Sequence, residues 1–211
     1  IALEFMKSNQ KNNTREFLKK LKPFFDFSIK NLEDVLSILA GLSIFSIIVF
    51  GAYFSDITYD EAYTYLNTGR IQDVWKIYLF RIANTHLLNS LLMTVTTLFF
   101  PYADFALRLP SVLISGIYVA ITISFSKKFK NRLVVLGLLL LFYYVVEYMT
   151  LARGYGMSAT FILAALFVYK EKNQFLQYHI WVVYLFMLAL YANYVAIVPF
   201  GIMVAYMFVV D

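Results

Sequence analysis

The sequence predicts an all-α polytopic membrane protein, with about six transmembrane helices and a large outer loop of juxtamembrane amphipathic helices. Apolar residues make up 61% of the 211 residues and charged residues only 15%, which excludes an ordinary soluble domain. A helix needs about 20 mostly apolar residues to cross a bilayer. The last of the apolar runs is long enough for two spans, with a break expected near Asn193–Tyr194. The runs lie at about 35–54, 84–100, 109–126, 133–149, 156–170 and 174–210.

Basic residues predict the orientation of these spans. Most of the 18 lysines and arginines lie in three clusters, before the first run, at Lys127–Arg132 and at Lys170–Lys172. Positive loops stay in the cytoplasm, so an even number of spans must separate the clusters. If the run 84–100 crossed the membrane, an odd number of spans would separate the first two clusters. It is also the most polar run, so we expect it to lie in the outer leaflet. The net charge of +5 thus indicates orientation and contact with membrane lipid, and not nucleic-acid binding.

The expected topology divides the chain into two parts. Residues 1–34 form a basic cytoplasmic segment, and residues 35–211 form a transmembrane module. Residues 55–108 of that module form the outer loop, which is the part most informative about function.

Three helical segments are expected in the outer loop. Thr58 and Glu61 fit a capping box that opens a short helix, which Gly69 would end. A third segment follows over 84–100, with Asn84 as its candidate N-cap. Between them, an apolar stripe at helical spacing predicts an interfacial amphipathic helix. The stripe consists of Ile71, Val74, Trp75, Tyr78 and Leu79.

Asp60 and Glu61 are the residues that most directly indicate chemistry. They are adjacent acids that land at the membrane surface a few residues beyond the first span. A purely structural role is the alternative, because acids in the first turn complete a capping box and favour the helix dipole.

Four short segments match, in order, motifs of one enzyme class. They are Asp60–Leu66 (DEAYTYL), His86–Leu92 (HLLNSLL), Asp104–Ser111 (DFALRLPS) and Leu151–Ser158 (LARGYGMS). Together they resemble the polytopic glycosyltransferases of the GT-C class, most nearly the dolichyl-phosphate-mannose–protein mannosyltransferase-like branch. Leu87–Leu88 departs from the family pattern, which has two prolines there. Leu151 stands where the family often has an acid.

The resemblance implies an inverting transfer of a sugar from a polyprenyl-phosphate donor to an acceptor on a protein, glycan or lipid. The site would face the outside of a bacterial inner or cell membrane. Asp60 matches the family's catalytic carboxylate and would act as general base, with Glu61 supporting it or binding substrate. Arg153 and His86 match residues close to the donor phosphate, and Tyr155 matches the aromatic residue after the arginine.

Glu147 is a candidate second carboxylate, one helical turn before the position of the family's acid. No cofactor is required, and no group of ligand residues has metal spacing. Asp60 and Glu147 could share Mg²⁺ or Mn²⁺ with the donor phosphate, since carboxylates suit these ions. A structural ion pair between Arg153 and Glu147, or an Arg153 that reaches the lipid headgroups, is the plain alternative.

The chain is shorter than the enzymes it resembles, so we expect it to hold their amino-terminal module without the carboxy-terminal half. A non-enzymatic membrane protein is the rival class: a lipid-linked sugar flippase, a transporter or an accessory subunit. The outer loop with its acid pair favours the enzyme.

Overall fold

The computed structural model describes residues 31–67, 86–100, 104–171 and 176–210, and all regular structure in these ranges is helical. The predicted all-α class is therefore confirmed for the described residues. The expected amphipathic helix at 71–79 lies outside them, and so does Gly69, the expected end of the helix that Thr58 and Glu61 open. The elements are α2 (Leu32–Phe54), α3 (Tyr59–Asn67), α4 (Leu87–Phe99), α5 (Asp104–Ser126), α6 (Arg132–Leu140), α7 (Tyr143–Thr150), α8 (Gly154–Lys170), α9 (Leu176–Ala192), the 3-10 helix η3 (Tyr194–Ala196) and α10 (Ile197–Val210).

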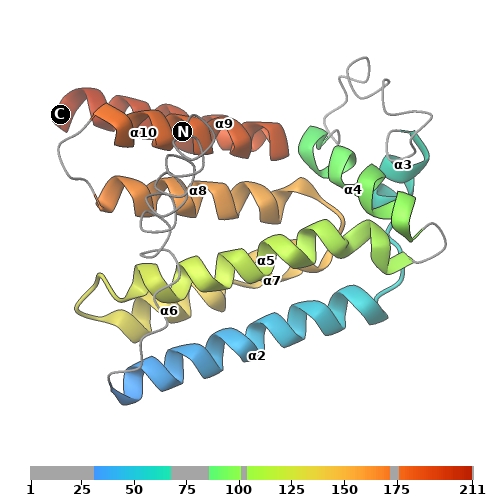
Figure 1. The fold of residues 1–211 in the computed structure, drawn as a ribbon, viewed down its shortest axis with the longest axis horizontal. Coiled ribbons are helices and arrows are strands. Elements are labelled where there is room, and N and C mark those ends of the chain that lie inside the picture. The colour runs from blue at the N-terminus through green and yellow to red at the C-terminus, as the bar shows by residue number, and fades with distance from the viewer. Residues whose placement is uncertain (1–30, 68–85, 101–103, 172–175, 211) are drawn as a thin grey trace, which may run out of the picture.

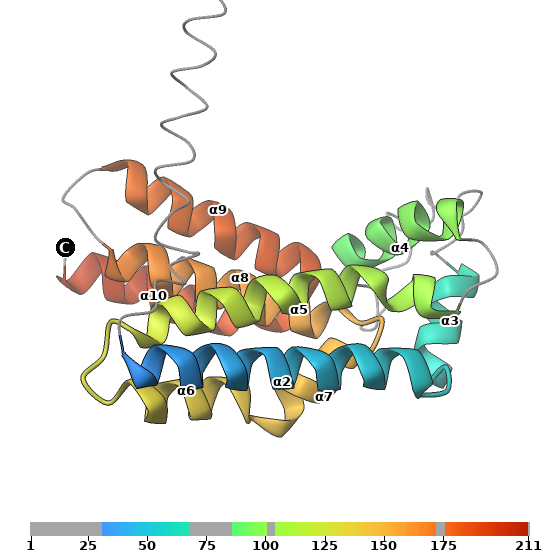
Figure 2. The same cartoon turned by 60° about the horizontal axis from the view of Figure 1, so that its bottom comes forward.

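The long helices lie side by side in one bundle with two distinct ends (Figure 1). Helices α3 and α4 and the α7–α8 connection gather at one end, which we call the α3 end. The start of α2, the α5–α6 turn and the end of α8 lie at the other, and the turned view of Figure 2 shows the same arrangement. We call this the basic end, defined by Lys127, Lys128, Lys130, Arg132 and Lys170. The acid pair and the described basic clusters therefore lie at opposite ends.

Two helices are long and apolar enough to cross a membrane. They are α2 and α5, with 23 residues each, and the bent pair α6–α7 makes a third if it counts as one span. Helices α8, α9 and α10 are apolar but shorter. Helix length and composition thus support a membrane protein, and six spans remain a prediction.

Two of the predicted apolar runs contain breaks. The run 133–149 is not one helix, because α6 and α7 meet at a bend of 47° around Leu141–Phe142. Nothing in the local sequence explains this bend, since neither residue is proline or glycine. The predicted break near Asn193 is confirmed between α9 and η3, where the Asn193 side chain accepts the N–H of Val195 at 2.9 Å.

The run 84–100 was predicted to lie in the outer leaflet without spanning the membrane. It forms the 13-residue helix α4, with His86 at its N-cap. The expected N-cap Asn84 is therefore wrong, since the helix begins three residues after it. Helix α4 buries the polar side chains of Asn89, Ser90 and Thr94 and contacts α5, α8 and α9. Its polar face thus points into the protein.

A proline helps to dock α4 onto α5. Pro110 lies inside α5 and has no N–H, so the carbonyl of Ala106, one turn earlier, lacks its helical donor. The hydroxyl of Thr96 in α4 donates to this carbonyl at 2.7 Å. The missing helical bond is replaced by one between the two helices.

The start of α2 is anchored at the basic end. Asn31 and Asp34 form a capping box, so the helix begins at Leu32, before the apolar run on which the prediction rested. Asp34 also accepts a hydrogen bond from Arg132 at 2.6 Å, and both side chains are buried. Further along α2, a Cβ on Gly41 would lie 2.7 Å from Ile123 of α5, so the glycine permits close packing of these helices.

Candidate functional site

The first turn of α3 places its two acids in different environments. Thr58 Oγ1 accepts the Glu61 N–H at 3.4 Å, and Glu61 Oε2 accepts the Thr58 N–H at 2.9 Å. The predicted capping box is therefore confirmed. Glu61 is completely buried, whereas the side chain of Asp60 is 37% exposed.

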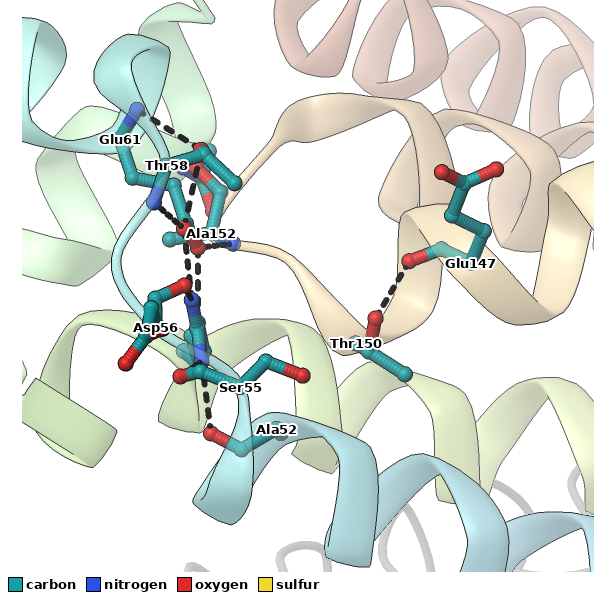
Figure 3. Close-up of polar contacts among 10 residues, drawn as sticks. Ala52, Ser55, Asp56, Thr58, Glu61, Glu147, Thr150 and Ala152 are labelled. Atoms are coloured by element: carbon teal, nitrogen blue, oxygen red, sulfur yellow. Dashed lines mark hydrogen bonds and ion pairs between the residues drawn. The ribbon is translucent and has the colours of Figure 1, made fainter.

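Glu61 forms a buried bidentate ion pair with Arg108 of α5. Arg108 Nε lies 2.8 Å from Glu61 Oε1, and Nη2 lies 2.7 Å from Oε2. The remaining guanidinium N–H groups donate to the backbone carbonyls of Ala52, Ser55 and Asp56, at 3.0, 2.7 and 2.7 Å. Every N–H of the guanidinium therefore has an acceptor. The pair joins the end of α2, the start of α3 and α5. Figure 3 labels Glu61 together with Ala52, Ser55 and Asp56.

Sequence reasoning gave Arg108 no role, although it lies in one of the four matching motifs. A signal was present, because Arg108 is the only charged residue between 105 and 126. A charge inside an apolar helix is costly unless it is paired. Its partner Glu61 lies 47 residues away in the chain and could not be named from the pattern.

The loop before α8 is held at the Ala152 peptide group from both sides. The Ala152 N–H donates to Glu61 Oε1 at 2.6 Å, and the Ala152 carbonyl accepts Asn89 Nδ2 at 2.8 Å. All three residues are buried. The next residue, Arg153, is thereby fixed relative to α3 and α4.

Asp60 and Arg153 form an ion pair directly beside this inner contact. Asp60 precedes Glu61 and Arg153 follows Ala152, so the inner hydrogen bond sets the register that brings the two charges together. Arg153 is the N-cap residue of α8, with extended backbone. Its side chain is 19% exposed, so the pair is only partly shielded from its surroundings.

Gly154 brings three elements into contact at the start of α8. A Cβ at this position would lie 1.8 Å from the carbonyl oxygen of Ala192 and 3.0 Å from the Cβ of His86. A side chain here is therefore excluded by the end of α9. His86 donates to the Ala192 carbonyl, and its ring meets that of Tyr155 edge to face at 5.0 Å.

Burial and hydrogen bonds set the charge states of Glu61 and His86. Burial raises the pKa of Glu61, but hydrogen bonds from Arg108, Ala152 and Thr58 outweigh it, so the pKa lies below its ordinary value of 4.5. Burial lowers the pKa of His86 below its ordinary value of 6.5, and the hydrogen bond to Ala192 only partly offsets this. Near neutral pH, Glu61 is therefore ionised and His86 is neutral.

Four of the predicted site residues lie together at the α3 end. Asp60 pairs with Arg153, the Arg153 guanidinium lies 6.0 Å from the Tyr155 ring, and Tyr155 contacts His86. We call these four residues the site. Glu61 lies beneath it in the buried ion pair, which favours a structural role over the predicted catalytic one.

Glu147 does not join the buried cluster below the site. Figure 3 shows its carboxylate well apart from Glu61, and the backbone carbonyl of Glu147 accepts the Thr150 hydroxyl at 2.7 Å. This placement gives no support to a metal ion shared by Asp60 and Glu147. No group of three or more His, Cys, Asp or Glu residues suited to a metal is found in the described ranges.

Comparisons with known proteins gave no match to a family model, a curated protein or a solved structure. The likeness to the GT-C class therefore remains a resemblance of motifs, and the function has to be inferred from the geometry of the site.

Proposed function

We propose that the chain is a glycosyltransferase module that moves a sugar from a polyprenyl-phosphate donor to an acceptor at the membrane surface, with Asp60 as general base. The observation that carries this proposal is the contrast within the acid pair. Glu61 is buried and bonded to Arg108, Ala152 and Thr58. Asp60 is 37% exposed beside a cation. The first carboxylate supports the fold, and the second is accessible to a substrate.

The proposed reaction follows the inverting transfer that the motifs imply. An acceptor oxygen attacks the anomeric carbon of the sugar, and its proton passes to the Asp60 carboxylate. The bond between the anomeric carbon and the phosphate oxygen breaks, and its electron pair leaves with the polyprenyl phosphate. The leaving phosphate gains a negative charge, which Arg153 can stabilise through two parallel hydrogen bonds.

The ion pair between Asp60 and Arg153 links donor binding to the base. A phosphate that binds Arg153 competes with Asp60 for the guanidinium, and the exchange of partners frees the carboxylate to accept a proton. We assign His86 a positioning role in place of a phosphate contact, because the residue is 4% exposed and its ring donates to Ala192. His86 and Tyr155 then hold the start of α8 in place.

We further propose six spans, formed by α2, α5, the α6–α7 pair, α8, α9 and α10, with the basic end in the cytoplasm. The gathering of cations at one end supports this orientation. Single-cysteine labelling tests it cleanly, because the chain has no native cysteine. A cysteine at Asp56 should react with an impermeant reagent from outside, and one at Lys128 should not. Labelling of Lys128→Cys from outside would reject the orientation.

A non-enzymatic protein such as a flippase, a transporter or an accessory subunit is the competing class, and one vesicle experiment separates it from the enzyme. The full chain is reconstituted in phosphatidylcholine vesicles with undecaprenyl-phosphate-linked hexoses that carry a radiolabel in the sugar, and a membrane extract supplies protein, glycan and lipid acceptors. The enzyme should move the label to an acceptor and leave undecaprenyl phosphate behind. A donor that changes leaflet with its sugar still attached contradicts the proposal and identifies a flippase.

A further inference from the structure

A continuous series of aromatic rings runs along α7 from the α6–α7 bend to the site. The rings of Phe142 and Tyr144 lie 5.9 Å apart, and those of Tyr144 and Tyr148 lie 6.5 Å apart and stacked. Tyr148 stacks on Tyr155 at 4.6 Å. The Tyr155 ring then lies 6.0 Å from the Arg153 guanidinium. These rings, which we call the aromatic track, connect the middle of the bundle with the charged pair.

The rings at the α6–α7 end of the aromatic track are exposed, although the proposed six-span arrangement puts them deep in the membrane. Phe142 and Tyr144 are each 57% exposed. Helix α6 has 9 residues before the bend, or about 14 Å at 1.5 Å per residue, close to half of a 30 Å hydrocarbon core. In the six-span arrangement, these rings therefore face lipid near the middle of the membrane. Tyrosines of membrane proteins gather at the membrane–water interfaces. These rings lie away from both interfaces in this arrangement, so an interfacial belt does not explain their position.

We propose that the aromatic track is the docking surface for the polyisoprenoid chain of the donor, an inference that rests on the proposed function. Arg153 fixes the phosphate end by charge complementarity. The chain attached to that phosphate must run from the membrane surface into the hydrocarbon core. The rings of Tyr155, Tyr148 and Tyr144 lie along this path, and their half-buried or exposed apolar surface is available to the methyl-branched chain.

The test compares two polyprenyl phosphates whose isoprenoid chains differ greatly in length. Binding of undecaprenyl phosphate and geranyl phosphate to the full chain is measured in phosphatidylcholine nanodiscs, for the wild type, Tyr144→Leu and Tyr148→Leu. Geranyl phosphate has two isoprene units, so its chain covers much less of the path from Arg153 to Tyr144 than that of undecaprenyl phosphate. Each substitution should weaken undecaprenyl phosphate binding by about three- to tenfold, the value of one aromatic contact. Tyr144→Leu should leave geranyl phosphate binding unchanged.

Tyr184→Leu is the matched control, because Tyr184 lies on α9 and is 52% exposed, much like Tyr144. It should leave both affinities unchanged. Undiminished undecaprenyl phosphate binding in Tyr144→Leu and Tyr148→Leu would overturn the proposal, and so would an equal loss in Tyr184→Leu. If binding depends on chain length but no sugar transfer is detected, the aromatic track remains the docking surface for the isoprenoid chain. Only the proposed glycosyltransferase activity is then rejected.

Discussion

Glu61 Oε1 accepts the backbone N–H of Ala152 at 2.6 Å, although 91 residues separate the two in the chain. This contact sets the register between α3 and the loop before α8. The neighbours Asp60 and Arg153 meet as a consequence. Glu61 and Ala152 are buried, whereas the ion pair of Asp60 and Arg153 is partly exposed. Substitution of Glu61 should therefore affect stability, and substitution of Asp60 or Arg153 should affect the chemistry.

Glu61→Gln should destabilise the protein. The amide keeps the size of the side chain but leaves the buried Arg108 without a counter-charge, which typically costs about 3–5 kcal/mol. Chemical denaturation in detergent measures the change in the free energy of unfolding. Asp60→Asn is the matched control at the neighbouring residue, and its partly exposed ion pair should contribute less than about 1 kcal/mol. Equal stability of Glu61→Gln and the wild type would show that the buried pair does not hold the fold.

The same substitution should change the response to acid. The pKa of Glu61 in the folded protein lies below its ordinary value of 4.5. Its charge therefore stabilises the fold fully above that value, and this stability is lost as the pH falls through the folded pKa. The wild type should lose more stability in this acid range than Glu61→Gln. Parallel profiles of stability against pH would contradict the assignment.

Gly154→Ala should disturb the start of α8. The added Cβ would lie 1.8 Å from the Ala192 carbonyl oxygen, so α8 and α9 would have to separate. We expect a loss of about 1–3 kcal/mol in the free energy of unfolding, as for other overpacked sites. Gly137→Ala is the control, because a Cβ on Gly137 meets no atom within 4 Å. Alanine favours a helix interior by up to about 1 kcal/mol, so Gly137→Ala should be neutral or stabilising.

The local features of the fold were predictable, and the distant contacts were not. The Thr58–Glu61 capping box and the break at Asn193 depend on residues within a few positions of each other, and both were predicted. The acceptors of Arg108 lie 47 to 56 residues away, so its role needed the structure. The α6–α7 bend was missed because its sequence is uninterrupted and apolar.

The order of four motifs grouped four candidate site residues. That order grouped Asp60, His86, Arg153 and Tyr155, and the structure joins these residues in a series that runs from Asp60 through Arg153 and Tyr155 to His86. Glu147 lies outside these motifs and was a candidate only because it stands one helical turn before Leu151, the position of the family's acid. The direction in which a helical side chain points depends on packing that no spacing rule supplies.

Arg153→Lys should weaken donor binding although the positive charge is kept. A lysine cannot form the two parallel hydrogen bonds of a guanidinium with phosphate. The loss of one charge-assisted hydrogen bond corresponds to about a tenfold weaker affinity for undecaprenyl-phosphate sugar. The affinity for the acceptor should be unchanged. Equal donor affinity in the two proteins would mean that Arg153 only reaches the lipid headgroups.

The most direct test of the central claim is the rate of sugar transfer by Asp60→Asn, measured beside Asp56→Asn in the same vesicles. Both substitutions turn an acid into its amide, and Asp56 is an exposed residue in the loop before α3. If Asp60 is the general base, its loss should slow transfer by about 10²- to 10⁴-fold without changing the amount of folded protein. Asp56→Asn should transfer sugar at the wild-type rate. Transfer by Asp60→Asn within a few-fold of the wild type would contradict the assignment of Asp60 as the base.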